Sequence, residues 1–298
     1  MSALSDGERL ERALACVPGW TRGLADLEVV ALAGGTANRT YRIRTPRGEF
    51  ALRLHAPERM LLGVDGASEL RLHEAAARAG IAPPLIAADP AGAFLITRYV
   101  RGRAWQENDM AEPTHLSELA RRLRALHALP MPQGAVPYEP ARLIRAHAER
   151  IARADPAAAS QLKSWVARAQ AIVAESASAG RPPGIIHNDL HHSNILQARG
   201  EVYLIDWEYA AVADPLFDLA CLLAYYPAAS AHAPLLLAEA GLAGTALAAL
   251  HEASWLHVLL SYLWYRVLAL QSPPSAASLI EEQRLRERLL QAASRGVS

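Results

Sequence analysis

A group of polar residues stands between two pairs of apolar residues in the stretch IIHNDLHHSNIL, residues 185–196. Asp189 is followed five residues later by Asn194, and His187 stands two residues before the aspartate. This spacing is typical of the catalytic loop of protein-kinase-like phosphotransferases. Phosphoryl transfer needs a carboxylate that orients the attacking hydroxyl, together with oxygen ligands for Mg²⁺ nearby. A tight loop with this spacing can place both kinds of group on one wall of a site.

A second carboxylate follows in the apolar stretch VYLIDWE, where Asp206 stands twelve residues after Asn194. The apolar residues before it predict a strand that ends at Asp206 and delivers its carboxylate to the same metal site. Mg²⁺ prefers carboxylate and amide oxygens together with the phosphates of its substrate. We therefore expect Asp189, Asn194 and Asp206 to converge on one nucleotide-bound Mg²⁺ ion.

The hydrophobic pattern predicts the elements that position these residues. In the first hundred residues, strand-like segments occupy residues 27–35, 40–54 and 93–100. Residues 6–15 predict a short amphipathic helix, and residues 67–81 predict a second helix between the strands. From about residue 104 the pattern is mostly helical, apart from a strand–loop–strand stretch that contains the polar loop.

These segments predict an α+β fold of two lobes. Residues 1–98 should form a small antiparallel-sheet lobe with one helix among its strands, which binds the nucleotide. Residues 99–298 should form a larger, mainly helical lobe for catalysis and substrate binding. We expect the hinge at about residues 97–103, with a cleft between the lobes.

The composition excludes several classes of protein. The 298 residues include 30 Lys and Arg against 30 Asp and Glu, which argues against a nucleic-acid-binding face. The two cysteines lie far apart without metal-ligand spacing, and a reducing compartment fits them best. The N-terminal stretch lacks the apolar core of a signal peptide, and the apolar stretch at residues 255–270 is too short and interrupted to span a bilayer. We expect a cytoplasmic protein without a membrane partner, and its oligomeric state stays open.

HNDLHHSNIL followed by YLIDWEYAAVADPLFDLA resembles the aminoglycoside phosphotransferase and choline kinase superfamily, most closely its bacterial choline-kinase and thiamine-kinase members. The resemblance extends from about Leu32 to Arg266. It implies a bilobal protein-kinase-like fold and the ATP- and Mg²⁺-dependent phosphorylation of a small hydroxylated metabolite. By this resemblance, Asp189 is the catalytic base, and Asn194 and Asp206 are the Mg²⁺ ligands.

The resemblance also implies which residues hold the nucleotide. LAGGTANRTYRI looks like the family's glycine-containing hairpin over the ATP phosphates, and Arg53 stands where protein kinases have a lysine. A guanidinium can pair with phosphate and with a helix carboxylate, for which Glu69 is the expected partner and Glu74 the alternative. Residues 96–100 should form the hinge whose backbone binds adenine. The expected nucleotide-binding residues are Gly34, Gly35, Thr36, Asn38, Arg53, Glu69, Arg98 and Tyr99.

Four further residues are expected to support the site. His187 should hold the loop by bonding backbone groups, and Asp218 should accept hydrogen bonds from loop N–H groups. Glu208 belongs to a triplet, Asp-Trp-Glu, that is neither D-F-G nor D-x-D; it could reach a second Mg²⁺ or only water around the first. Asp214 is either a turn residue before a proline or a substrate contact.

Aromatic residues late in the chain are candidates for the acceptor site. Trp264 and Tyr265 sit at helical spacings, so core packing is the default, but aromatic faces also attract cations such as quaternary ammonium groups. We interpret His191 and His192 as loop-packing or surface residues rather than zinc ligands, since no cysteine or third histidine falls at ligand spacing.

Several acceptors are compatible with the predicted fold. A choline- or thiamine-like alcohol fits the late aromatic residues best. The alternatives are an aminoglycoside or sugar kinase of the same fold, or a kinase-like module that binds nucleotide without catalysis. A protein kinase is disfavoured, because no A-P-E segment follows Asp206.

Overall fold

The computed structural model describes residues 5–17, 20, 27–32, 38–56, 65–271 and 273–295. By their contacts the residues form two compact units. Unit 1 comprises Met1–Trp105, Leu129–Val136 and Ser193–Ala211, and unit 2 comprises Gln106–Ala128, Pro137–His192 and Val212–Ser298. The predicted lobes, residues 1–98 and 99–298, are each continuous in sequence, whereas each unit combines three separate segments. The boundary between the predicted lobes stays a prediction.

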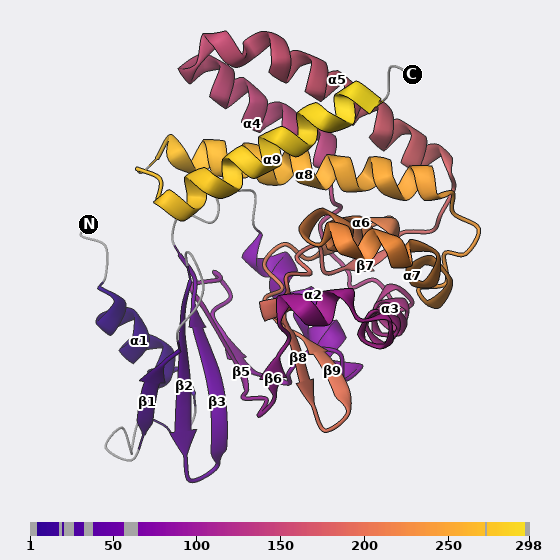
Figure 1. Cartoon of the computed structure of the whole chain (residues 1–298). Helices are drawn as coiled ribbons and strands as arrows, with labels where there is room; N and C mark the ends of the chain where they lie inside the picture. The colour runs from indigo at the N-terminus through magenta and orange to yellow at the C-terminus, as the bar shows by residue number, and fades with distance from the viewer. Residues whose placement is uncertain are drawn as a thin grey trace. The chain divides into compact units, whose positions relative to one another are not determined.

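Unit 1 contains an antiparallel five-stranded sheet with the strand order β1-β2-β3-β5-β4 (Figure 1). The strands are β1 (Glu28–Ala31), β2 (Arg39–Thr45), β3 (Gly48–Leu54), β4 (Leu85–Ala88) and β5 (Phe94–Arg98). The expected hairpin joins β2 to β3, with Thr45 paired to Gly48. Gly48 has a φ of 124°, a conformation that residues with a Cβ rarely adopt.

Two helices complete this part of unit 1. Helix α1 (Asp6–Ala15) begins with a capping box between Ser5 and Glu8, and its buried side packs against the core of the sheet. Helix α2 (Gly66–Arg78) is capped by Asp65, whose carboxylate accepts from two N–H groups of the first turn. Its buried residues recur at helical spacing and form one face; they are Ser68, Glu69, Leu72, His73 and Ala76.

A second sheet in unit 1 has the strand order β6-β8-β9. Its strands are β6 (Arg103–Ala104), β8 (Ile195–Ala198) and β9 (Glu201–Leu204). The turn from β8 to β9 contains Arg199 and Gly200, with φ of 54° and 78°. Gly102 allows close approach to β8, because a Cβ there would lie 2.5 Å from the carbonyl oxygen of Gln197. The β8–β9 hairpin carries both predicted metal ligands at its open end.

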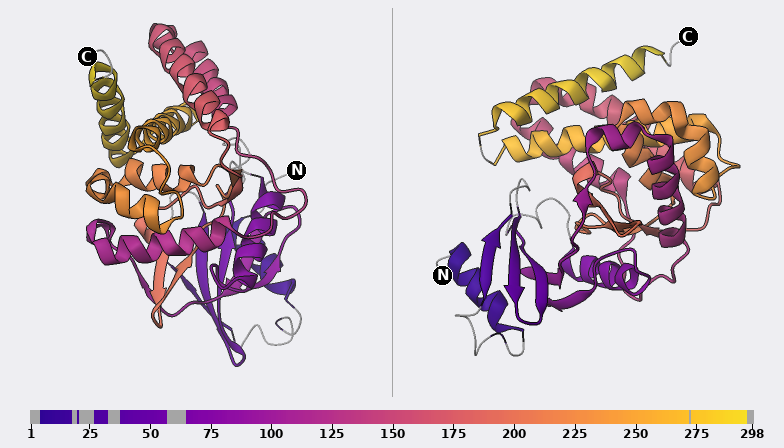
Figure 2. Two further views of the ribbon diagram at one scale, coloured as in Figure 1. Left: turned by 90° about the vertical axis from the view of Figure 1, so that its right-hand side faces the viewer. Right: turned by 60° about the horizontal axis from the view of Figure 1, so that its bottom comes forward.

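Unit 2 is mainly helical. Its elements are α3 (Pro113–His127), α4 (Pro140–Ala154), α5 (Ala159–Ser178), β7 (Gly184–Ile186), α6 (Leu216–Tyr225), α7 (Ala233–Glu239), α8 (Leu247–Ala269) and α9 (Ala276–Arg295), with short 3₁₀ turns at Glu107–Ala111, Pro156–Ala158 and Pro227–His232. Strand β10 (Ala211–Ala213) and the 3₁₀ turn His192–Asn194 each include residues of both units. Helix α8 contacts α4, α5, α6 and α9, which explains why it is apolar on several sides. Figures 1 and 2 show α9 lying beside α8.

Among the described residues, no helix combines the length and the apolar character that crossing a bilayer requires.

Candidate active site

The predicted metal ligands Asn194 and Asp206 flank the open end of the β8–β9 hairpin. The N–H of Ile205 donates to the carbonyl oxygen of Asn194 at 2.9 Å. Asp206 therefore directly follows a residue that is hydrogen-bonded to Asn194. Asp206 has a φ of 67°, a left-handed conformation that is costly for a residue other than glycine. Trp207 fixes the chain beyond it, because this buried side chain donates from Nε1 to the carbonyl of Leu204 at 2.9 Å.

Arg53 on β3 forms an ion pair with the carboxylate of Asp206. Burial alone would lower the pKa of Arg53, but the charges of Asp206, Glu208 and Glu69 raise it above its ordinary value. The carboxylate of Glu69, the expected helix partner, lies 3.3 Å from Nε2 of His55. Arg53 is therefore paired with the predicted metal ligand, while Glu69 acts on it through its charge.

Glu208 belongs to the same cluster of charges in unit 1. Its carboxylate accepts a hydrogen bond from the amide of Asn38 at 2.9 Å, and the Asn38 carbonyl accepts from the N–H of Ala56, also at 2.9 Å. Burial, followed by the charge of Asp206, raises the pKa of Glu208 to about 7, although Asn38 and Arg53 act in the opposite direction. Asn38, expected at the nucleotide phosphates, thus positions Glu208 in this structure.

The donor set at this end of the hairpin fits Mg²⁺. Asn194 offers an amide oxygen and Asp206 a carboxylate, which are hard oxygen ligands of the kind that Mg²⁺ selects. In the part of the chain that the structure describes, no group of three or more His, Cys, Asp or Glu side chains could hold a metal ion. A magnesium ion at Asn194 and Asp206 would complete its shell with water and with substrate phosphates, as Mg²⁺ commonly does.

The remaining nucleotide-binding predictions concern the glycine loop and the hinge. Gly34, Gly35 and Thr36 lie outside the described residues. In the hinge, the N–H of Arg98 donates to the backbone carbonyl oxygen of Pro84 at 2.8 Å, and the N–H of Tyr99 donates to the backbone carbonyl oxygen of Glu49 at 3.0 Å. Because both amide hydrogens are already engaged, contacts from these two residues to adenine would have to use other atoms.

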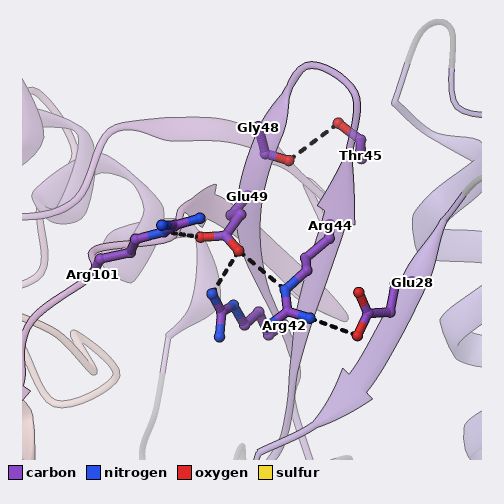
Figure 3. Close-up of polar contacts among 7 residues, drawn as sticks. All are labelled: Glu28, Arg42, Arg44, Thr45, Gly48, Glu49 and Arg101. Carbon is purple, nitrogen blue, oxygen red and sulfur yellow. Dashed lines mark hydrogen bonds and ion pairs between the residues drawn. The ribbon is translucent and has the colours of Figure 1, made fainter.

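Glu49 ties the end of the hinge to the β2–β3 hairpin (Figure 3). Its carboxylate accepts from Arg42 at 2.5 Å, from Arg44 at 3.1 Å and from Arg101. The hydrogen bond from Arg101 is the main reason that the pKa of Glu49 falls to about 2. Arg44 also pairs with Glu28 of β1 at 2.6 Å, so the cluster joins three strands and the hinge.

In unit 2, the loop after β7 is held by the fully buried carboxylate of Asp218. This carboxylate accepts from the N–H of His187 at 3.1 Å, from the N–H of Asn188 at 2.7 Å and from Nε2 of His127 at 2.8 Å. These are contacts of the kind expected for Asp218. Gly184 lets β7 approach the end of α3, since a Cβ there would lie 2.5 Å from the His127 carbonyl oxygen. Asn188 has a φ of 62°, next to the predicted base.

Two tyrosines that the sequence analysis did not single out contact this loop. Tyr225 donates from its hydroxyl to Oδ1 of Asp189 at 2.7 Å. The hydroxyl of Tyr226 accepts from the N–H of His192 at 2.8 Å and lies 2.7 Å from its Nδ1. A signal for Tyr225 exists in the sequence, because it stands seven residues, or two helical turns, after Asp218.

Uncharged rings surround Tyr225. His191 and His257 each pack edge-on against it, with ring centroids 5.6 Å away. Burial lowers the pKa of both histidines to about 4, with a further contribution from His192 at His191. Both imidazoles are therefore neutral near pH 7, and the rings present an aromatic surface without positive charge.

The predicted pocket residues Trp264 and Tyr265 lie on α8, half-buried, with their rings perpendicular at 5.0 Å. Burial is the main cause that raises the pKa of Tyr265, and the negative charge of Asp189 adds to it. Tyr265 therefore lies within electrostatic reach of the predicted base.

Asp214 is engaged in contacts inside unit 2. It accepts from Arg181 at 2.6 Å, from the hydroxyl of Ser176 at 2.7 Å and from the N–H of Leu216 at 3.0 Å. Of the two roles considered for Asp214, these contacts support the turn residue that begins α6.

A comparison with protein-family models decides the family. Residues 28–256 match the model of the phosphotransferase enzyme family, APH. The chain belongs to this family. Membership confirms the predicted resemblance and places this phosphotransferase in the enzyme class that the sequence predicted.

Solved structures share the fold of this phosphotransferase. It is similar to choline kinase LicA from Streptococcus pneumoniae, with a TM-score of 0.77 and 18% identity over 96% of this chain and 100% of that one. A choline/ethanolamine kinase family protein from Mesorhizobium loti gives a TM-score of 0.73 and 21% identity over 96% and 93% of the two chains. The streptomycin–ATP complex of APH(2″)-IIa gives a TM-score of 0.62 and 14% identity over 98% of this chain and 97% of that one. These likenesses confirm the predicted kinase-like α+β fold.

A curated relative matches over a short stretch. The LicA homolog of Mycoplasma capricolum is 42% identical over 38 residues, which is 13% of this chain and 16% of that protein. The chain therefore covers about a sixth of the length of this relative.

Proposed function

We propose that this phosphotransferase transfers the γ-phosphoryl group of ATP, with Mg²⁺, to the hydroxyl of a small cationic alcohol of the choline or thiamine kind. The observation that carries the proposal is the placement of Asp189, whose carboxylate is held by Tyr225 among neutral aromatic rings. Use of ATP as the donor also agrees with the cytoplasmic location expected from the sequence.

In this mechanism, Asp189 orients the acceptor hydroxyl and accepts its proton as the bond between the acceptor oxygen and the γ-phosphorus forms, while the bond from that phosphorus to its bridging oxygen breaks and ADP leaves. Asn194 and Asp206 would hold the magnesium ion, which supplies charge neutralisation at the phosphates when it is bound. Arg53 offsets negative charge beside Asp206. The transition state of phosphoryl transfer is loose, so the contribution of these residues lies in positioning and electrostatics.

The carboxylates of residues 214–271 favour a monocationic acceptor over an aminoglycoside. Residues 214–271 contain four carboxylates, and each already has a partner: Asp214 with Arg181, Asp218 with the loop, Glu239 with Arg121 and Glu252 with Arg168. A polycation would need several further acceptors. A single cation can instead lie on aromatic faces, where each contact contributes about 0.5 to 2 kcal/mol. The choline and ethanolamine kinases with a similar fold support the same choice.

An assay of ADP release tests the proposal. The purified chain is incubated with ATP and choline, ethanolamine, thiamine, amino sugars or aminoglycosides, each with and without Mg²⁺. We expect Mg²⁺-dependent release with a cationic alcohol, and release slower by about 10²- to 10⁴-fold from Asp189→Asn protein. ADP release with aminoglycosides alone would overturn the proposed class of acceptor. Nucleotide binding without ADP release for any compound would instead favour a non-catalytic module.

A further inference from the structure

Helix α6 contacts successive residues of the loop that carries Asp189. At the start of the helix, Asp218 accepts from the backbone of His187 and Asn188. One turn later, Sγ of Cys221 accepts from the N–H of Leu190 at 3.3 Å. At the end of the helix, Tyr225 reaches the side chain of Asp189 itself. One face of α6 therefore fixes both the backbone of the loop and its functional side chain.

The contact between Tyr225 and Asp189 has the chemistry of an orienting bond. An ionised carboxylate only accepts hydrogen bonds, so the phenol hydroxyl is the donor at 2.7 Å. Such charge-assisted bonds are stronger than neutral ones. The bond restricts rotation of the carboxylate about its Cβ–Cγ axis. It therefore selects which carboxylate oxygen faces the hydroxyl of the phosphate acceptor.

The ring of Tyr225 is itself held on two sides. His191 of the loop contacts it at an interplanar angle of 81°, and His257 of α8 contacts it at 70°. Edge-to-face contacts of this kind stabilise one ring position. The hydroxyl is therefore presented to Asp189 from a ring that has little freedom to move.

We propose that Tyr225 is a positioning residue that sets the orientation of the Asp189 carboxylate for proton acceptance. This role rests on the proposed function of Asp189 as the base. Misplacement of a catalytic group by a fraction of an ångström to 1 Å lowers turnover strongly without affecting the binding of the other substrate. Loss of the hydroxyl should therefore lower kcat and leave nucleotide binding unchanged.

Tyr225→Phe tests the role, because it removes the hydroxyl and keeps the ring between its two neighbours. We expect kcat to fall by about 10- to 100-fold, as for loss of a hydrogen bond to a charged group, with the KM for ATP unchanged. The matched control is Tyr262→Phe, which removes a hydroxyl that accepts from Arg266 at 2.9 Å, and which should keep the kcat of the parent protein. Equal melting temperatures would show that both variants are folded.

A double variant separates this inference from the proposed function. If Tyr225 acts through Asp189, adding Tyr225→Phe to Asp189→Asn should not lower the residual rate further. An inactive Asp189→Asn protein together with a Tyr225→Phe protein of unchanged kcat would overturn the positioning role and leave the function standing. An unchanged rate in Asp189→Asn would instead overturn the proposed function. A further loss in the double variant would assign Tyr225 a role independent of Asp189 and overturn the inference.

Discussion

The guanidinium of Arg53 is paired with the carboxylate of Asp206, which lies 153 residues later in the chain. Both side chains are largely buried, with 18% of each exposed, and Glu208 adds a second carboxylate to their surroundings. The pair thus joins strand β3 to the end of the β8–β9 hairpin within unit 1. It also supplies the positive charge that allows two acidic side chains to lie close together.

Arg53→Met should destabilise the protein by about 2 kcal/mol or more, because removal of one partner leaves a carboxylate buried without a counter-charge. Urea unfolding at pH 8 measures the change. The control is Arg39→Met in the same sheet, whose pair with Asp6 is exposed and should contribute less than about 1 kcal/mol. Equal unfolding midpoints for the two variants would show that the Arg53 pair is not stabilising.

Replacement of the two predicted acidic site residues should have different kinetic effects. Asp189→Ala should lower kcat by about 10²- to 10⁴-fold, the usual contribution of a general base, while ATP still binds. Asp206→Ala should instead weaken the binding of magnesium–nucleotide, measured by titration calorimetry at several Mg²⁺ concentrations. An Asp206→Ala protein with unaltered affinity would contradict the metal role.

Asp218→Ala should cost about 3 kcal/mol or more of unfolding free energy, because it leaves two buried N–H groups of the loop without their acceptor. Asp218→Asn keeps one acceptor oxygen and should lose less. Urea unfolding of both variants, with kcat measured on the folded proteins, checks the expectation. If both changes cost the same small amount, Asp218 does not hold the loop.

The neutral state of His257 predicts a dependence of stability on pH. Its folded pKa of about 4 lies below the ordinary value of 6.5, so the unfolded chain binds the proton first as the pH falls. Stability is complete above pH 6.5 and is lost between pH 6.5 and 4, with about 2 kcal/mol lost at pH 5. His257→Phe should show a smaller difference in urea midpoint between pH 7.5 and pH 5. A difference as large as that of the parent protein would mean that His257 does not titrate in this range.

Local spacing was sufficient to predict the loop, the hairpin and the antiparallel sheet, because each depends on residues close together in the chain. The interleaved units were not predicted, since the inclusion of residues 129–136 and 193–211 in unit 1 arises from tertiary contacts. Ion-pair partners were equally hard to assign. Several arginines and carboxylates have suitable charge and reach, and only the fold determines that Glu69 meets His55 while Arg53 meets Asp206.

The contact of Tyr225 with Asp189 illustrates the same limit. Helical spacing from Asp218 puts the tyrosine on the correct face of α6, but aromatic residues at such spacings usually belong to the core. Asn38 shows the converse case, because a residue type suited to phosphate is used to hold Glu208. Sequence reasoning therefore proposes residues for a site more readily than it predicts their mutual contacts.

The left-handed backbone at Asn188 and Asp206 has a consequence for anyone engineering this protein. Glycine relaxes such positions, so a search for thermostable variants would be drawn to both of them. At Asn188 that exchange would also remove a side chain that bonds to Tyr138, and at Asp206 it would remove the carboxylate. At Asp206 glycine would also leave the largely buried Arg53 guanidinium without its counter-charge, so the relief of backbone strain would be offset by the loss of the ion pair and the exchange would not yield a more heat-resistant protein.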